Sequence, residues 1–399
     1  MLIGVVGKPN CGKSTLFKAL TLAEVEIANY PFATIKPNHG VGYVRIECAD
    51  KDFGVQCSPR EGYCIDHARF VPVQLMDVAG LVPGAYEGKG MGNQFLDDLR
   101  QADALIHVID VSGGTNDKGE PVGAGSYDPA RDIRFLENEL DMWYLGILKK
   151  PWDKFARQVQ MEHSEVAKAI AKQFSGLGVT EEMTEEVIRE TRVDPLKVAE
   201  WTAEQLKQVA IAFRRRTKPM LIAANKIDVP NAADTLKRLK KEFPQYTIIG
   251  CSAESELALK EAAKHGLIKY IPGAASFAVN DAAKLSEKQR HALQFIKSHL
   301  LDAFGSTGVQ KVIDEAVFGL LRYVAVFPGG VNKLEDQHGN VLPDCFLMPP
   351  GSTALDFAFR LHTDFGRNFI KAVNVKTKLP MAKDHILENR DVVEIMSGK

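Results

Sequence analysis

Gly7-Lys8-Pro9-Asn10-Cys11-Gly12-Lys13-Ser14 is the stretch of the sequence that decides the fold. It has the pattern GxxxxGKS and lies between an apolar, β-branched run, Leu2–Val6, and a helical pattern that begins at Thr15. In that context the glycines let the backbone curl so that its N–H groups point inward, and the helix N-terminus adds its dipole. We therefore predict that Gly7 to Thr15 bind the phosphates of a nucleotide. Lys13 is expected to reach the β- and γ-phosphates and to act in hydrolysis, and the Ser14 hydroxyl to bind Mg²⁺.

The composition limits the class of protein. The chain has 399 residues, enough for two or three domains, and a formal charge of −1, so no overall field attracts nucleic acid or a membrane. No apolar run approaches the length of a membrane span. A strand begins at residue 2, which leaves no room for a signal peptide, and we expect a cytoplasmic protein.

Six cysteines are then expected to be thiols. Cys48, Cys57 and Cys64 fall in one polar, turn-rich stretch. Their spacing fits no familiar zinc pattern, which would contain CxxC-type pairs and a fourth ligand. Ordinary thiols are the favoured interpretation, a metal or a disulfide is the alternative, and the sequence assigns these three residues no role.

Apolar strand patterns alternate with helical patterns on both sides of a long helical interruption. From residue 128 to residue 216, apolar side chains recur at three- and four-residue steps, with a break expected at Pro151. One strand–helix–strand crossover needs a single helix, so this stretch is read as an insertion. Later helices are expected over 232–243, 255–270 and 286–304, and short strands follow from Leu321. The expected domains are a nucleotide-binding domain in two parts, 1–127 and 218–280, a coiled-coil-like helical insertion, 128–217, a helical connector, 281–320, and a small α+β domain, 321–399.

Two segments are placed to sense a γ-phosphate. Asp77 ends an apolar strand and can hold Mg²⁺ through water, and the N–H of Gly80, in the same DxxG segment, can meet the γ-phosphate. Thr34 lies in a proline-flanked loop and would supply a second hydroxyl to Mg²⁺ when a triphosphate is bound. These segments would be switches that a triphosphate orders and hydrolysis releases.

A fourth motif, Asn225-Lys226-Ile227-Asp228, follows a buried strand and points to guanine. The Asp228 carboxylate can accept hydrogen bonds from the ring N–H and the exocyclic amine of guanine. Adenine cannot donate that pair, and sites built in this way discriminate by roughly 10⁴–10⁵. Ser252 and Ala253 follow the next strand and are placed to offer backbone N–H groups to guanine O6.

At this point the sequence resembles a translation-factor-class GTPase of the Obg superfamily, in the YchF-related branch with archaeal members. The matching stretches are GKPNCGKST, NYPFATIKPNHG and DVAGLVPGAYEGKGMGNQFLDDLRQADALIHVID, and residues 322–398 resemble a TGS domain. The resemblance implies a Ras-like P-loop domain with a mostly parallel sheet, a helical insertion and a C-terminal, ubiquitin-like β-grasp domain. The YchF group proper lacks the aspartate of NKxD and is associated with ATP. Because Asn225, Lys226 and Asp228 are all present here, the resemblance implies GTP.

Hydrolysis is expected to be slow. Ras-like switches place a glutamine after the DxxG glycine to orient water, and here that position is Leu81, so the resemblance implies a hydrophobic-substituted GTPase. Asn10 is similar to an asparagine that helps related GTPases hold a monovalent cation, and K⁺ is one hypothesis for it. The alternative is that Asn10 only shapes the loop. His107 lies inside an apolar strand and is expected to be an ordinary core histidine, and His39 is assigned no role.

The partner is the least determined property. Lysines and arginines outnumber acids over 360–383, and two further basic clusters, 214–216 and 237–241, lie on expected helices. They would contact RNA or simply be solvated or favour helix ends. One hypothesis is a monomeric GTP switch that acts on ribosomes or translation factors. The other is an ATP-preferring or dual-specificity NTPase that regulates stress responses through protein partners.

Overall fold

The computed structural model describes residues 1–22, 38–78, 98–162, 164–281 and 284–398. Its contacts divide the chain into two compact units, each formed by segments from distant parts of the sequence. The first unit contains Met1–Phe17 and Leu75–Ser252, and the second contains Lys18–Gln74 and Ala253–Lys399.

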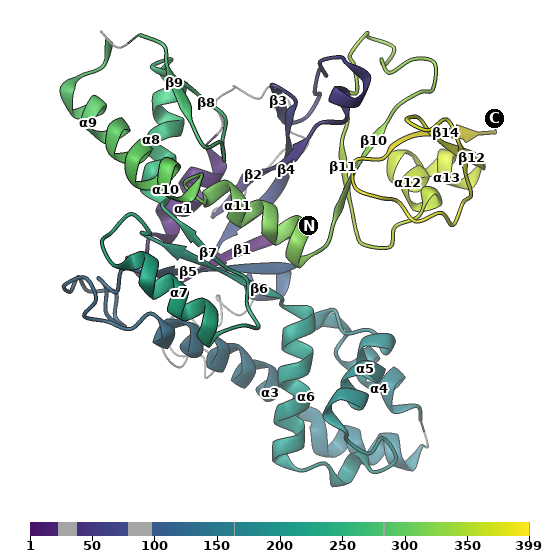
Figure 1. Ribbon diagram of the computed structural model, residues 1–399. Helices are drawn as coiled ribbons and strands as arrows, with labels where there is room; N and C mark the ends of the chain where they lie inside the picture. Colours follow the sequence, from purple (N-terminus) through teal and green to yellow (C-terminus); the bar gives the residue numbers. More distant parts are fainter. Residues whose placement is uncertain (23–37, 79–97, 163, 282–283, 399) are drawn as a thin grey trace. The chain divides into compact units, whose positions relative to one another are not determined.

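Parallel strands form the centre of the first unit (Figure 1). They pair in the order β1 (Leu2–Val6), β5 (Ala104–Asp110), β6 (Met220–Asn225) and β7 (Ile248–Cys251). Every residue of β5 and β6 is buried, as expected for apolar runs in a parallel sheet. The end of β4 (Ala68–Asp77) follows on the other side of β1, where Val78 N–H donates to the Val5 carbonyl at 3.0 Å. Parallel strands end at one edge of a sheet, so the loops after these strands meet there.

The helical insertion is confirmed, and its core is continuous with that of the sheet. It consists of α3 (Ala130–Met161), α4 (Val166–Gln173), α5 (Glu181–Thr191) and α6 (Ala203–Thr217). The break expected at Pro151 is wrong, because α3 runs through it. Proline removes one helical hydrogen bond, but the next residue, Trp152, is buried and stacks on Trp201 with ring centroids 5.2 Å apart. Packing therefore holds the helix together across the proline. Helix α7 (Ala232–Glu242) follows β6, as expected.

The second unit contains β2 (His39–Glu47), which neighbours β4, and β3 (Tyr63–Ile65), which pairs antiparallel with β4. Its helices include α8 (Ala253–Lys264), α9 (Glu287–Ile296), α10 (Asp302–Phe304) and α11 (Val309–Asp314). The helix expected over 255–270 ends early, and the hairpin of β8 (Ile268–Tyr270) and β9 (Phe277–Val279) takes its place. Gly266, with a φ of +67°, adopts the left-handed conformation that stops the helix.

The C-terminal region confirms the expected β-grasp fold. Its five strands pair in the order β11 (Phe346–Met348), β10 (Val324–Pro328), β14 (Val392–Ser397), β12 (Phe369–Asn374) and β13 (Pro380–Met381). Only β10 and β14 pair in parallel; the other pairs are antiparallel. Helix α12 (Ala354–Leu361) packs its buried Phe357 into the core of this sheet, and α13 (Thr363–Arg367) follows it.

Among the described helices, none combines the length and the apolar character that crossing a membrane would require.

Candidate functional site

The phosphate-binding loop joins β1 to α1 (Lys13–Thr21), as the sequence predicts. Asn10 and Gly12 have φ angles of 60° and +93°, which turn successive backbone groups toward one another. A Cβ atom on Gly12 would lie 2.1 Å from the Asn225 side-chain nitrogen, and one on Gly7 would lie 2.6 Å from the Val108 carbonyl oxygen. Only glycine fits at these two positions. The motif therefore has glycine there because any side chain would collide with neighbouring atoms.

Lys13 and Asp77 meet at the start of α1. The Lys13 ammonium forms an ion pair with the Asp77 carboxylate and donates to the Val78 carbonyl at 2.9 Å. The Ser14 side chain is exposed in the first turn of the same helix, and Thr15 follows it. A cation, a hydroxyl, a carboxylate and a helix N-terminus are the groups that a magnesium-bound triphosphate requires, so these residues fit that ligand. Thr34, Gly80 and Leu81 lie outside the described residues.

The NKID motif is attached to the phosphate-binding loop by its first two side chains. The Asn225 amide donates to the Cys11 carbonyl at 3.0 Å, and the Lys226 ammonium donates to the Asn10 carbonyl at 3.1 Å. Asp228 is partly buried in the turn that follows β6. Ser252 is buried directly after β7, and Ala253 begins α8. The order β1-β5-β6-β7 thus brings together two motifs that are more than 200 residues apart.

Asp110 holds Lys226 of the NKID motif and the start of the glycine-rich loop that begins at residue 112, a role that sequence reasoning missed. It ends β5, is 1% exposed, and accepts hydrogen bonds from the Thr115 hydroxyl at 3.0 Å and from Lys226 at 2.7 Å. It also accepts from the Ser112 backbone N–H at 3.1 Å. The available signal in the sequence was an acid at the end of a strand that is apolar except for His107.

Lys8 points away from the phosphate side and into the protein. Its ammonium lies 2.8 Å from the Asp132 carboxylate, donates to the Thr115 carbonyl at 2.9 Å and sits 3.9 Å from the centre of the Tyr127 ring. Burial raises the pKa of Asp132 above its ordinary value, and the Lys8 charge opposes that shift. Lys8 therefore fixes the glycine-rich loop, residues 112–127, and only its backbone remains to contact phosphate.

Asn10 also binds the glycine-rich loop. Its side-chain amide donates to the Gly119 carbonyl at 2.9 Å. Gly119 has a φ of +80°, and a Cβ atom there would lie 2.5 Å from the Pro9 carbonyl oxygen. This close approach supports the interpretation that Asn10 shapes the loop, over the hypothesis that it holds K⁺.

His107 is a core residue, as expected. It is 3% exposed within β5, and burial lowers its pKa to about 3, with a smaller effect of the Lys8 charge. A histidine that stays neutral and faces no solvent cannot exchange protons with a bound nucleotide. His39 begins β2, and nothing in its surroundings assigns it a role.

The basic clusters differ in how far their side chains are buried and paired with carboxylates. Arg214 is 1% exposed and paired with Asp141 at 2.7 Å, so the idea that it contacts RNA is wrong. A buried guanidinium needs a carboxylate partner, and helix α3 supplies it. The following Arg216 is paired with Glu190 at 2.7 Å. Over residues 360–383, by contrast, five basic side chains are exposed: Arg360, Arg367, Lys371, Lys378 and Lys383.

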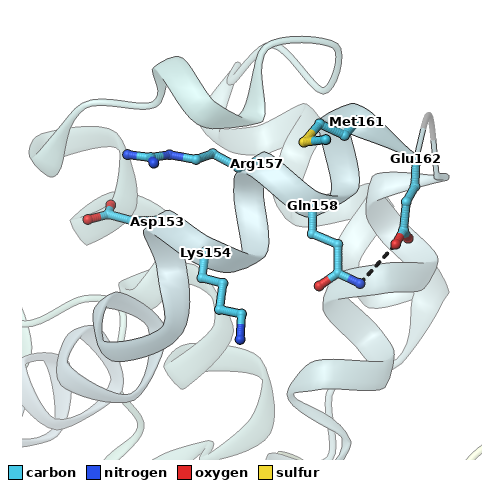
Figure 2. A pocket seen from close by; sticks show the side chains of 6 residues that line it. All are labelled: Asp153, Lys154, Arg157, Gln158, Met161 and Glu162. Carbon is cyan, nitrogen blue, oxygen red and sulfur yellow. Dashed lines mark hydrogen bonds between the residues drawn. The ribbon is translucent and has the colours of Figure 1, made fainter.

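A surface hollow lies on the second half of α3, apart from the phosphate-binding loop (Figure 2). Its lining side chains come from this helix and from the residue that caps it, Glu162: Asp153, Lys154, Arg157, Gln158, Met161 and Glu162. Gln158 donates to Glu162 at 2.9 Å across one turn, an ordinary contact on a helix surface. One helix face with no convergent polar groups makes no ligand site.

Three known protein families match successive parts of the chain. They are described as a 50S ribosome-binding GTPase over residues 2–137, the G4 motif-containing domain of the Obg-like GTPase YGR210-like group over residues 223–330, and a TGS domain over residues 337–397. Together they cover the phosphate-binding loop, the NKID motif and the β-grasp region.

Whole-chain relatives agree with this order of domains. An uncharacterized GTP-binding protein of Methanocaldococcus jannaschii is 49% identical over 100% of this chain and 99% of its own length. The ribosome-binding ATPase YchF of Mycoplasma genitalium is 29% identical over 92% of this chain and 86% of its own. The crystal structure of a GTP-binding protein from Pyrococcus horikoshii is 40% identical, covers 100% of both chains and superposes with a TM-score of 0.79.

Proposed function

This chain belongs to the Obg-like, YchF-related GTP-binding proteins with a C-terminal TGS domain, and on that premise we propose that it is a guanine-nucleotide switch that hydrolyses GTP slowly. The observation that carries the proposal is the attachment of Asn225 and Lys226 to the backbone of Asn10 and Cys11. This attachment fixes Asp228 relative to the loop that holds the phosphates. A base and a phosphate chain can then be bound at one time by groups whose spacing is set in advance.

The catalytic roles follow from the groups present. Lys13, Ser14 and Asp77 would hold the magnesium triphosphate, with Thr34 as the second hydroxyl and the Gly80 N–H at the γ-phosphate. Mg²⁺ would neutralise the charge that develops on the phosphate oxygens. With Leu81 in place of a water-orienting glutamine, turnover is expected near the slow end of the range of roughly 10⁻⁴–10⁻² s⁻¹ for unaided switches. Such a rate suits a switch.

We further propose that the switch acts in the cytoplasm, on ribosomes or other RNA. Support comes from the YchF relative, which is named a ribosome-binding ATPase, and from the exposed basic side chains of the TGS domain. Contacts between lysines and phosphates release counterions and weaken steeply with salt. Association with ribosomes should therefore fall between about 50 and 200 mM salt, and replacing Lys371, Lys378 and Lys383 with glutamate should reduce that salt dependence.

The base pocket is tested by measuring the affinities of GDP and ADP, and of non-hydrolysable GTP and ATP analogues, with Mg²⁺. We expect guanine to be preferred by roughly 10⁴. Asp228→Ala should remove most of that preference, while Asp234→Ala, which changes an exposed aspartate on α7, should leave it intact. Equal or adenine-favouring binding by the unaltered protein would reject the assignment and support the ATP-preferring alternative suggested by YchF.

A further inference from the structure

Three thiols and one carboxylate converge at the end of β2, outside the nucleotide site. The donor atoms of Cys48, Asp50, Cys57 and Cys64 all lie within 4.8 Å of one another. The sulfur atoms of Cys48 and Cys57 are 3.5 Å apart, and the Cys64 sulfur is 3.9 Å from Asp50 Oδ2. We call these four residues the four-donor cluster. Cys48, Asp50 and Cys57 are buried and Cys64 is partly exposed.

Local backbone structure builds the four-donor cluster from three short segments. Cys48 follows β2, and its N–H donates to the His67 carbonyl at 2.7 Å. A 3-10 turn, Ala49–Phe53, places Asp50 next to it and ends at Gly54, which has a φ of +65°. The chain then returns, and the Cys57 N–H donates to Asp50 Oδ2 at 2.8 Å. Cys64 comes from β3.

Ordinary core packing does not account for this arrangement. Buried thiols behave as small apolar residues, yet here they surround Asp50, a carboxylate with no exposed surface. The Cys57 N–H and His67 Nδ1 compensate part of the cost of burying this carboxylate, but they do not account for the three thiols gathered against it. A disulfide would join two of the sulfurs and leave the third thiol and the carboxylate unexplained. Four convergent donors of these types are instead what a tetrahedral metal site requires.

We propose that Cys48, Cys57, Cys64 and Asp50 bind one Zn²⁺ as a structural site. Zn–S bonds of about 2.3 Å in a tetrahedron place two sulfurs about 3.8 Å apart, close to the separation of Cys48 and Cys57. Thiolates exclude Mg²⁺ and Ca²⁺ from the site, and the carboxylate oxygen favours Zn²⁺ over Cu⁺.

The surroundings of the four-donor cluster suit a negatively charged metal centre. Three thiolates and a carboxylate around Zn²⁺ carry a net charge of −2. Arg69 is 1% exposed and brings its guanidinium within 3.5 Å of the Cys57 sulfur. His67 Nδ1 lies 2.9 Å from Asp50 Oδ1 and holds the carboxylate in place, as partners of metal ligands commonly do.

Zinc at this position would stabilise a segment that has little regular structure of its own. Residues 54–62 contain no helix or strand, yet Ser58 N–H donates to the Val341 carbonyl at 2.8 Å and Arg60 N–H to the Pro343 carbonyl at 2.9 Å. The apolar side of Cys48 and Cys57 also packs against Phe327 and Val392 of the TGS region. The proposed ion would thus brace the surface on which the TGS region packs.

The experiment uses the full-length protein purified with zinc in the growth medium and without chelators. Elemental analysis should find one zinc per chain. Replacement by Co²⁺ should give thiolate charge-transfer absorption and the visible bands of a tetrahedral ion. Asp50→Asn should lower zinc affinity, measured against a competing chelator, by more than the ~10–100-fold typical of an outer partner, and His67→Ala by about that range. Cys57→Ala should abolish binding, while Cys345→Ala, a neighbouring thiol outside the cluster, should retain it.

Two results would overturn the proposal. One is wild-type protein that contains no zinc and shows no tetrahedral spectrum when one equivalent of Co²⁺ is added. The other is a Cys48–Cys57 disulfide found by mass spectrometry in protein purified without reductant. Should Cys57→Ala fail to fold, the wild-type cobalt spectrum and the Asp50→Asn affinity decide the question alone. None of these readouts depends on nucleotide binding.

Discussion

The phosphate-binding loop and the four-donor cluster are both binding sites by their chemistry, but they are built in opposite ways. The loop is one contiguous run whose backbone N–H groups are expected to bind phosphate. The conformation of Asn10 and Gly12 decides the shape of the loop. The four-donor cluster uses side chains at positions 48, 50, 57 and 64, and its backbone only brings them together. A site made by backbone leaves glycines in the sequence, whereas a site made by side chains leaves only residue types at irregular spacing.

Distance along the chain does not explain why the phosphate-binding loop was predictable and the four-donor cluster was not. The loop depends on Asn225 and Lys226, more than 200 residues away, while all four donors fall within 17 residues. The distant support was predictable because each motif follows its own apolar strand and parallel strands end at one edge. The local cluster was not, because a 3-10 turn and an irregular return decide which side chains meet.

The largest expected effect is the loss of nucleotide affinity when a side chain of the phosphate-binding loop is removed. Lys13→Ala should weaken GTP-analogue binding by about 10²–10⁴-fold, because two charge-assisted contacts of ~1.5–3 kcal/mol each are lost. Titration calorimetry gives the affinity. Lys18→Ala, which removes an exposed lysine 3.8 Å from Glu261, is the matched control and should bind normally. Unchanged affinity in Lys13→Ala would mean that this lysine does not face the phosphates.

A smaller effect, on the stability of the fold, is expected from a substitution beside the four-donor cluster. Arg69→Met leaves the carbonyls of Leu342 and Pro343 without the guanidinium that now donates to them at 3.2 and 2.8 Å. We expect a loss of about 2–5 kcal/mol in the free energy of unfolding, measured with urea, and no change in GDP affinity. Arg60→Met, at an exposed ion pair with Asp336, should cost under about 1 kcal/mol. Equal losses in the two variants would contradict the assigned role of Arg69.

The third expected effect is spread over several pH units and is small in each: it is a pH dependence centred on Asp314, which accepts from the Arg45 backbone N–H of β2 at 2.7 Å. Burial raises the pKa of Asp314 to about 7. Between about pH 4 and 7 the folded state keeps a proton that the unfolded state releases, so stability falls as pH rises, by at most about 1.4 kcal/mol per pH unit. Asp314→Asn should remove this slope, and Asp302→Asn, at an exposed site, should retain it. A wild-type slope of the opposite sign would refute the assignment.

Several details of the fold escaped prediction for one shared reason. Pro151 was expected to break a helix, Arg214 was placed in a cluster that would contact RNA or favour a helix end, and Lys8 was counted only as part of the phosphate-binding loop. In the structure Trp152 packs against Trp201, Asp141 pairs with Arg214, and Asp132 pairs with Lys8. Each outcome depends on a partner that the residue's own neighbours in the sequence do not reveal.

The sequence by itself determined the elements whose backbone demands particular residues. These elements are the glycines of the phosphate-binding loop, the apolar runs that end in Asp77, Asp110 and Asn225, and the helical period of 128–216. They were enough to predict a P-loop domain with a helical insertion. Only the tertiary structure decided which side chains are paired, buried or gathered. The free energy of a buried charge or thiol depends on what surrounds it, and the surroundings exist only once the chain has folded.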